Sequence, residues 1–117
     1  MLTKSANGYR YLPDFICVGA QKSGTTTLYN VLRKHAEIYL PKTKELHYFD
    51  HKELKPLEYI EREFKESSAH HKKGDITPYY MFHEYGAQNI YNVVPHARIL
   101  MLLRDPVERS LSHYWHA

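Results

Sequence analysis

Two glycines separated by four residues, with a lysine between them and two threonines after them, indicate a phosphate-binding loop. The run consists of Gly19, Ala20, Gln21, Lys22, Ser23, Gly24, Thr25 and Thr26. An apolar stretch precedes it, and an amphipathic helical pattern begins at Gly24. Backbone N–H groups in a glycine turn and at a helix N-terminus attract anions. The pattern therefore predicts a phosphate site; a plain tight turn between strand and helix is the alternative.

The position of the lysine bears on which nucleotide would bind. Loops that bind ATP or GTP place a lysine directly after the second glycine, where it reaches the β and γ phosphates, and the next hydroxyl holds Mg²⁺. Thr25 occupies that position here, and Lys22 lies inside the loop. We therefore expect the loop to bind a nucleotide, as the donor of a transferred group, whose 5' chain is shorter than a triphosphate. We expect no obligatory metal ion.

Predicted strands and helices alternate along the chain. Short apolar or extended runs predict strands at 15–18, 38–40, 72–77 and 98–103, the last buried on both faces. Apolar residues at helical spacing predict helices from 24 to about 35, at 56–67, at 84–94 and after Asp105. This order predicts an α/β fold, P-loop-like, with three α/β/α layers and a central parallel sheet. Ligands in such folds bind beyond the carboxyl ends of the strands, here after Val18 and Leu103.

The length of 117 residues, 43% of them hydrophobic, suits a single folded domain. Residues 1–14 mix glycine, proline and polar groups, which predicts an irregular lead-in. Residues 15–117 are interpreted as the N-terminal part of one domain. Because a strand followed by a helix is still in progress at residue 117, we expect the domain to be truncated at its C-terminus.

The charge is mildly basic, with a net value of +3. Residues 1–50 carry seven Lys/Arg and four Asp/Glu, whereas residues 51–117 carry nine of each. This distribution suits a small polyanionic ligand better than a nucleic acid, which usually requires a continuous basic stripe. The sequence has neither a long apolar run nor a signal-peptide pattern, so we expect a cytoplasmic protein without a membrane partner. The oligomeric state is left open.

The nine histidines do not form a recognised metal-binding pattern. His70 and His71 are adjacent, and His113 and His116 lie three residues apart. Neither pair has a cysteine or a carboxylate at a known ligand spacing. We therefore expect no metal site.

Four segments resemble the sulfotransferases that use 3'-phosphoadenosine 5'-phosphosulfate (PAPS). Residues 15–26 resemble the 5'-phosphosulfate loop of that family, and residues 104–114 resemble its 3'-phosphate motif. Residues 44–50 resemble the acceptor-site segment of the carbohydrate branch, the heparan-type N- and 3-O-sulfotransferases, and residues 74–80 resemble a further segment of that branch. The similarity covers about residues 14 to 117.

The resemblance implies PAPS as the co-substrate and assigns its contacts. Lys22 would contact the bridging oxygen and the 5'-phosphosulfate, and the remaining loop contacts would come from Ser23, Gly24, Thr25 and Thr26. Arg104 and Ser112 would hold the 3'-phosphate. This arrangement is physically sound, because a guanidinium binds a phosphate through two parallel hydrogen bonds and a hydroxyl adds a third.

The resemblance also implies that Glu45 is the catalytic carboxylate. In-line transfer to a hydroxyl requires a base that takes the proton as the oxygen attacks. If residues 45–47 are extended, His47 points to the same side as Glu45 and is the alternative base. Lys22 would offset the charge that builds on the sulfuryl group and on the departing phosphate, and Lys44 could assist.

The chain also departs from the family pattern. The heparan-type branch commonly has a lysine before the Thr-Pro pair, whereas this chain has Ile76 there and Asp75 before it. The acceptor side is therefore expected to differ from that branch. The resemblance as a whole implies a hydroxyl, or an amine, of a carbohydrate or small molecule as the acceptor. Two other functions stay open: a P-loop kinase or nucleotidase, and a non-catalytic nucleotide-binding fragment. Whether this stretch turns over by itself is also open.

Overall fold

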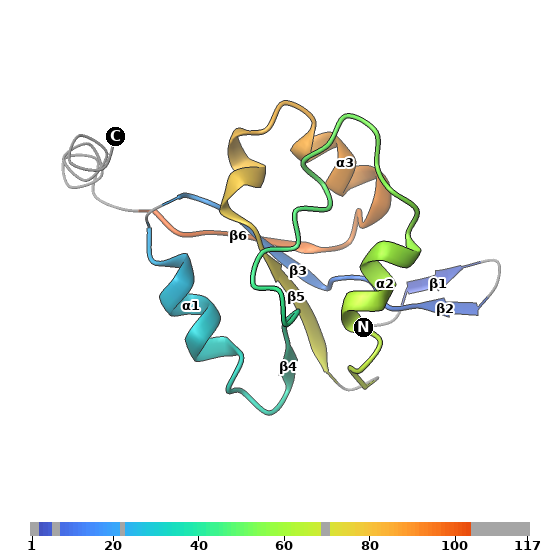
Figure 1. Ribbon diagram of the computed structural model, residues 1–117, viewed down its shortest axis with the longest axis horizontal. Helices are drawn as coiled ribbons and strands as arrows, with labels where there is room; N and C mark the ends of the chain where they lie inside the picture. The colour runs from blue at the N-terminus through green and yellow to red at the C-terminus, as the bar shows by residue number, and fades with distance from the viewer. Residues whose placement is uncertain (1–2, 6–7, 22, 69–70, 104–117) are drawn as a thin grey trace.

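A four-stranded parallel sheet forms the centre of the molecule (Figure 1). The computed structural model describes residues 3–5, 8–21, 23–68 and 71–103. The strands are β1 (Thr3–Ser5), β2 (Gly8–Arg10), β3 (Phe15–Gly19), β4 (Ile38–Tyr39), β5 (Lys72–Ile76) and β6 (Arg98–Met101). The helices are α1 (Thr25–Leu32), α2 (Glu58–Phe64), the 3-10 helix η1 (Pro78–Phe82) and α3 (Gly86–Val93). The sheet order is β4-β5-β3-β6, and β1 and β2 form a separate antiparallel pair.

Alternate residues of β3 point to opposite faces of the sheet, and different helices cover the two faces. Ile16 and Val18 pack in a cluster that includes residues of α2, η1 and α3. Cys17 packs in a second cluster, to which α1 contributes Leu28 and Leu32. Figure 1 accordingly shows α1 on one side of β3 and α3 on the other. The described residues thus confirm the predicted α/β/α layers around a parallel sheet.

The carboxyl ends of β3 and β6 lie side by side. The two strands pair in parallel, with Gly19 opposite Met101. Beyond this pair, the Ala20 N–H donates to the Leu102 carbonyl at 3.0 Å, and the Leu102 N–H donates to the Gly19 carbonyl at 2.8 Å. The two predicted anion-binding segments therefore leave the sheet at neighbouring points.

A glycine makes room for the aromatic residue that begins β3. Phe15 pairs with Gly74 of β5 in the parallel register. A Cβ atom at position 74 would lie 2.0 Å from the Phe15 ring. Any larger side chain would overlap that ring, so a glycine at this position keeps β3 and β5 in contact.

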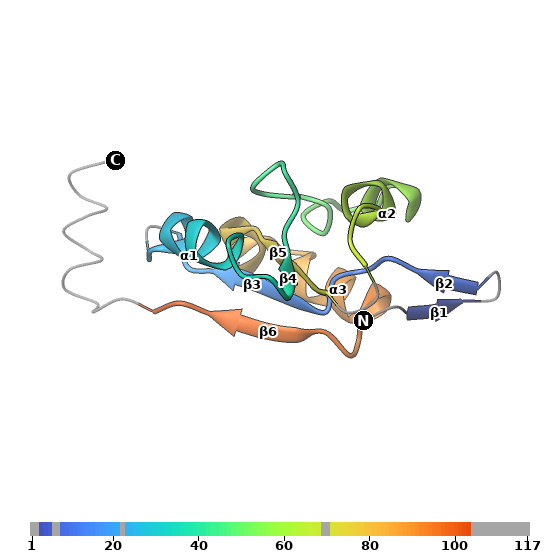
Figure 2. The same cartoon turned by 90° about the horizontal axis from the view of Figure 1, so that it is seen from below.

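The strand β6 differs from the prediction, which had it buried on both faces. All four of its residues are exposed, and Ile99 and Met101 expose 46% and 58% of their surfaces. The reason is its position at the edge of the sheet, where β3 is its neighbour and the opposite side has no described strand (Figure 2). The apolar composition of β6 was a correct indication of a strand, but not of its environment.

Several element boundaries also differ from the predictions. The expected irregular lead-in contains the β1–β2 pair. The helix predicted at 84–94 begins at Gly86, and η1 was not predicted. On α1, Val31 is exposed although its spacing suggested a covered position.

Among the described residues, no helix is both long and apolar enough to cross a membrane.

Candidate functional site

An open pocket of about 290 Å³ lies at the carboxyl end of β3. Three segments contribute its walls: the β3–α1 loop, the loop that follows β4, and the start of η1. The lining residues are Gln21, Gly24, Thr25, Thr26, Lys44, Glu45 and Pro78. Two groups predicted from separate parts of the sequence, the phosphate loop and Glu45, therefore share one pocket.

The β3–α1 loop has the features of an anion site. Gly24 caps α1 with φ at +90°, in the left-handed region that glycine adopts without strain. The first turn of α1 contains no acidic residue. The Ser23 hydroxyl is buried and has no hydrogen-bond partner among the described residues. Because buried hydroxyls are normally paired, Ser23 is a loop hydroxyl whose hydrogen-bonding capacity the described residues leave unused.

A lysine from outside the loop contributes a positive charge to the pocket. The Lys44 ammonium donates to the Thr26 hydroxyl at 2.6 Å and lies 3.7 Å from the Glu45 carboxylate. The hydrogen bond to Thr26 fixes the ammonium beside the start of α1. The sequence interpretation had given Lys44 only an assisting role.

Three of the predicted donor contacts lie outside the described residues. These are Lys22, Arg104 and Ser112. The described strand ends that lead toward Lys22 and Arg104 are hydrogen-bonded to each other, as Ala20 and Leu102 show. The roles of the three residues stay predictions.

Glu45 and His47 belong to one chain of hydrogen bonds. His47 Nε2 lies 3.0 Å from Glu45 Oε1, and His47 Nδ1 lies 2.6 Å from Asp50 Oδ2. Partial burial disfavours the imidazolium, but the hydrogen bond to Asp50 and the charges of Asp50 and Glu45 outweigh it and raise the pKa of His47. A protonated His47 can therefore donate to both carboxylates at once.

The backbone brings these side chains together differently from the prediction. An extended backbone at 45–47 was the condition under which the sequence placed His47 beside Glu45; His47 instead has φ at +53°, and the two side chains are nevertheless in contact. A positive φ is uncommon for a residue other than glycine. Asp50, which the sequence interpretation missed, accounts for part of this geometry by binding the His47 ring from three residues further along.

Sequence reasoning also missed a buried polar group beneath the segment 45–50. The side-chain oxygens of Asp75, Thr77 and Tyr80 accept hydrogen bonds from the backbone N–H groups of residues 46–49. The signal in the sequence was a carboxylate, Asp75, within the predicted strand at 72–77. Among the described residues, no group of three or more His, Cys, Asp or Glu side chains is arranged to hold a metal ion.

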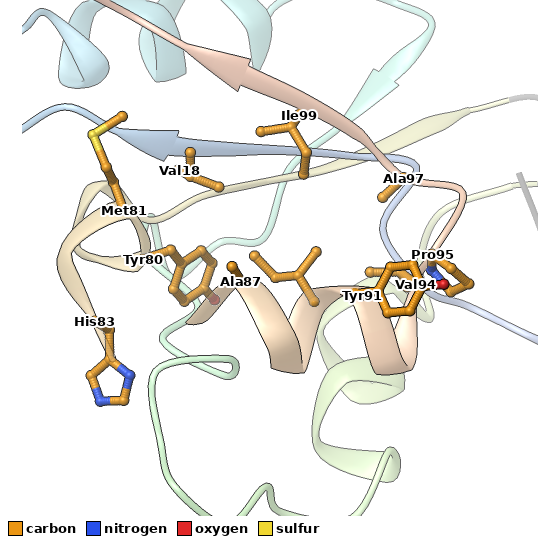
Figure 3. Close-up of a pocket in the computed structure, with 11 residues that line it drawn as sticks. Val18, Tyr80, Met81, His83, Ala87, Tyr91, Val94, Pro95, Ala97 and Ile99 are labelled. Atoms are coloured by element: carbon orange, nitrogen blue, oxygen red, sulfur yellow. The ribbon is translucent and has the colours of Figure 1, made fainter. Parts of the chain in front are cut away.

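A second pocket, about 260 Å³ in volume, has a different character (Figure 3). It lies between α3 and the strands β3 and β6, and most of its lining is apolar, including Val18, Met81 and Ile99. None of the described residues of the phosphate loop lines this second pocket, and neither does Glu45. The polar pocket at the end of β3 is therefore the candidate site.

Comparisons with known proteins agree on one family. Residues 12–117 match the family described as "Sulfotransferase domain". The membrane-associated sulfotransferase kil1 of Dictyostelium discoideum is 39% identical over 88% of this chain and 22% of its own length. Heparan sulfate glucosamine 3-O-sulfotransferase 5 of Mus musculus is 28% identical over 88% of this chain and 30% of its own length.

A solved structure supports the same comparison. The sulfotransferase from Alicyclobacillus acidocaldarius matches 89% of this chain with a TM-score of 0.76 and 31% sequence identity. The match covers 49% of that protein. The chain therefore spans about half of this structural relative and less than a third of the two curated relatives.

Proposed function

This chain belongs to the sulfotransferase family, and on that premise we propose that it carries the donor loop and the base of a PAPS-dependent sulfotransferase. The reaction would move a sulfuryl group from PAPS to a hydroxyl or amine group of an acceptor. The supporting observation is the pocket that the phosphate loop and Glu45 line together. One pocket thus offers both anion-binding groups and a carboxylate.

The residues of the loop suit the donor. The start of α1, the Lys44 ammonium and the Ser23 hydroxyl, which has no partner in the described part of the chain, all favour an anion at this point. We assign the 5'-phosphosulfate to Lys22, Ser23, Gly24, Thr25 and Thr26. We assign the 3'-phosphate to Arg104 and Ser112. PAPS supplies the sulfuryl group, and no step of this proposal requires a metal ion.

Glu45 is assigned as the base. As the acceptor oxygen or nitrogen forms its bond to sulfur, the bond between sulfur and the 5'-phosphate oxygen breaks, and Glu45 takes the acceptor proton. The products are the sulfated acceptor and adenosine 3',5'-bisphosphate. Lys22 and Lys44 offset the negative charge that develops on the leaving phosphate.

We propose a carbohydrate as the acceptor, with a small hydroxylated molecule as the alternative. The names of the heparan sulfate relatives specify a glucosamine residue as the group that they modify. Ile76 replaces the lysine common in the heparan-type branch, so the sugar need not be the same. The cytoplasmic location expected from the sequence stays a prediction.

Calorimetry with two nucleotides tests this function against a kinase or nucleotidase. We expect adenosine 3',5'-bisphosphate to bind without a metal ion and more tightly than Mg-ATP, because the lysine that contacts the γ phosphate in ATP-binding loops is replaced by Thr25. A titration with Mg²⁺ alone is the control. Preference for Mg-ATP would contradict the proposal, and bisphosphate binding without transfer to any acceptor would favour a non-catalytic module.

A further inference from the structure

Three buried side chains form a polar cluster beneath the segment that carries Glu45. This cluster, the Asp75 cluster, consists of Asp75 and Thr77, which are fully buried, and Tyr80, which is 2% exposed. The Thr77 hydroxyl donates to Asp75 Oδ1 at 2.7 Å, and the Tyr80 hydroxyl donates to Asp75 Oδ2 at 2.6 Å. Both oxygens of the carboxylate are thus paired with hydroxyl groups.

The same two hydroxyl oxygens accept hydrogen bonds from the backbone of residues 46–49. Thr77 Oγ1 accepts from the N–H groups of Leu46 at 3.0 Å and His47 at 3.4 Å. Tyr80 Oη accepts from Tyr48 at 3.0 Å and from Phe49 at 3.5 Å. Asp75 itself accepts from Leu46 at 3.4 Å. Four consecutive N–H groups therefore end on one cluster.

The charge of Asp75 fixes the direction of these hydrogen bonds. An ionised carboxylate only accepts, so each hydroxyl must give its single proton to Asp75. The lone pairs of Thr77 and Tyr80 are then left for the backbone N–H groups. A neutral residue that donates at position 75 would compete with those N–H groups for the same oxygens.

We propose that Asp75, Thr77 and Tyr80 are positioning residues that set the place of Glu45 and His47 for sulfuryl transfer. This inference rests on the proposed function. Glu45 directly precedes Leu46, and His47 has an unusual φ of +53° that its surroundings must maintain. Thr77 of the Asp75 cluster accepts hydrogen bonds from the N–H groups of Leu46 and of His47 itself, and these bonds supply that constraint.

The pKa of Asp75 sets the pH range in which this arrangement of hydrogen bonds holds. Burial raises the pKa of Asp75 to about 6, although hydrogen bonds from Tyr80, Thr77 and Leu46 and the charge of His47 oppose that increase, so the carboxylate is ionised at pH values above that. Burial raises the pKa of the Cys17 thiol on β3, and the charge of Asp75 adds to that increase, while a hydrogen bond to the Gly19 carbonyl opposes it. Burial and the Asp75 charge also raise the pKa of Tyr80, which keeps it a hydrogen-bond donor.

Substitution of Thr77 tests the proposal, because valine keeps the shape but removes the hydroxyl. We expect Thr77→Val to lower kcat by about 10- to 100-fold, since small displacements of a catalytic group cost that much. The Kd for adenosine 3',5'-bisphosphate should change by less than about threefold, because no residue of the Asp75 cluster lines the pocket beside the phosphate loop. Thr77→Ser keeps the hydroxyl and should retain most of kcat.

Amide hydrogen exchange provides a readout that does not depend on activity. The N–H groups of residues 46–49 should exchange faster in Thr77→Val than in the wild type or in Thr77→Ser. Ile60→Val, a similarly conservative change at a fully buried position on α2, is the matched control and should change neither kcat nor this exchange.

Three separate results would overturn the inference. The first is a wild-type kcat in Thr77→Val, and the second is unchanged exchange at 46–49 in that protein. The third is an equal loss of kcat and of bisphosphate affinity, which indicates general damage to the fold. A wild-type protein that transfers no sulfuryl group would contradict the proposed function instead, and the exchange rates would still decide whether Thr77 holds the segment.

Discussion

The protonation of His47 changes the charge that lies beside Glu45. When His47 is an imidazolium, it donates to Glu45 Oε1 at 3.0 Å and places a positive charge against that carboxylate. When His47 is neutral, that charge is absent. Because Asp50 and Glu45 raise the pKa of His47 despite its partial burial, His47 loses its proton above the ordinary pKa of histidine.

This coupling predicts a pH dependence of the transfer rate. We expect kcat to rise with pH through the raised pKa of His47, since the neutral ring no longer holds the Glu45 carboxylate as a cationic donor. His47→Gln, which cannot become a cation, should lose that limb of the profile. Measurement of kcat from about pH 5 to pH 9 in both proteins checks this. A profile unchanged by the substitution would contradict the coupling.

The structure describes some of the predicted site residues and not others. Thr25, Thr26 and Glu45 line one pocket, because the sequence pattern correctly located the end of β3 and the loop that follows it. The contact of His47 with Asp50 could not be predicted, because it depends on a left-handed backbone that no local pattern indicates. Lys22, Arg104 and Ser112 lie outside the described residues.

At the scale of elements, the local sequence pattern predicted burial correctly where the apolar face of an amphipathic helix packs on the core. Ile60 and Phe64 of α2 are fully buried, as their spacing predicted. Patterns were insufficient where an element depends on distant partners. The Asp75 cluster joins residues that are 29 to 32 positions apart in the chain, and a short sequence window contains only one side of each contact.

The burial of the Asp75 carboxylate on β5 makes the stability of the protein depend on pH. The pKa of Asp75 is about 6 when folded, against an ordinary value of 3.8, so the folded state binds the proton more tightly. The contribution of Asp75 to stability is therefore fully present below about pH 4 and is lost as the pH rises through about 6. Two pKa units correspond to roughly 3 kcal/mol.

We therefore expect the wild type to lose on the order of 3 kcal/mol of stability between pH 4 and pH 7 relative to Asp75→Asn. The asparagine has no charge to bury, so it removes this particular dependence while other titrating groups stay in common. Urea unfolding of both proteins at the two pH values measures the difference. An equal pH dependence in the two proteins would show that Asp75 is not the group responsible.

At the scale of the whole molecule, the topology explains why one pocket collects residues from three segments. Parallel strands end at the same edge of the sheet, so the loop after β3 lies beside the chain that leaves β6. The segment 45–50 reaches this edge by packing Tyr48 and Phe49 into the core beside Tyr80. The alternation of strands and helices was enough to predict this edge, whereas the exposure of β6 was not predictable from its composition.

The most direct test of the account is sulfuryl transfer by Glu45→Gln. With radiolabelled PAPS and a panel of carbohydrate and small hydroxylated acceptors, the wild-type protein should label at least one acceptor. Glu45→Gln should lower kcat by at least about 100-fold and keep the Kd for adenosine 3',5'-bisphosphate within about threefold, because it removes the base and leaves the loop intact. Near-normal turnover of Glu45→Gln would contradict the assignment of Glu45 as the base and would favour His47.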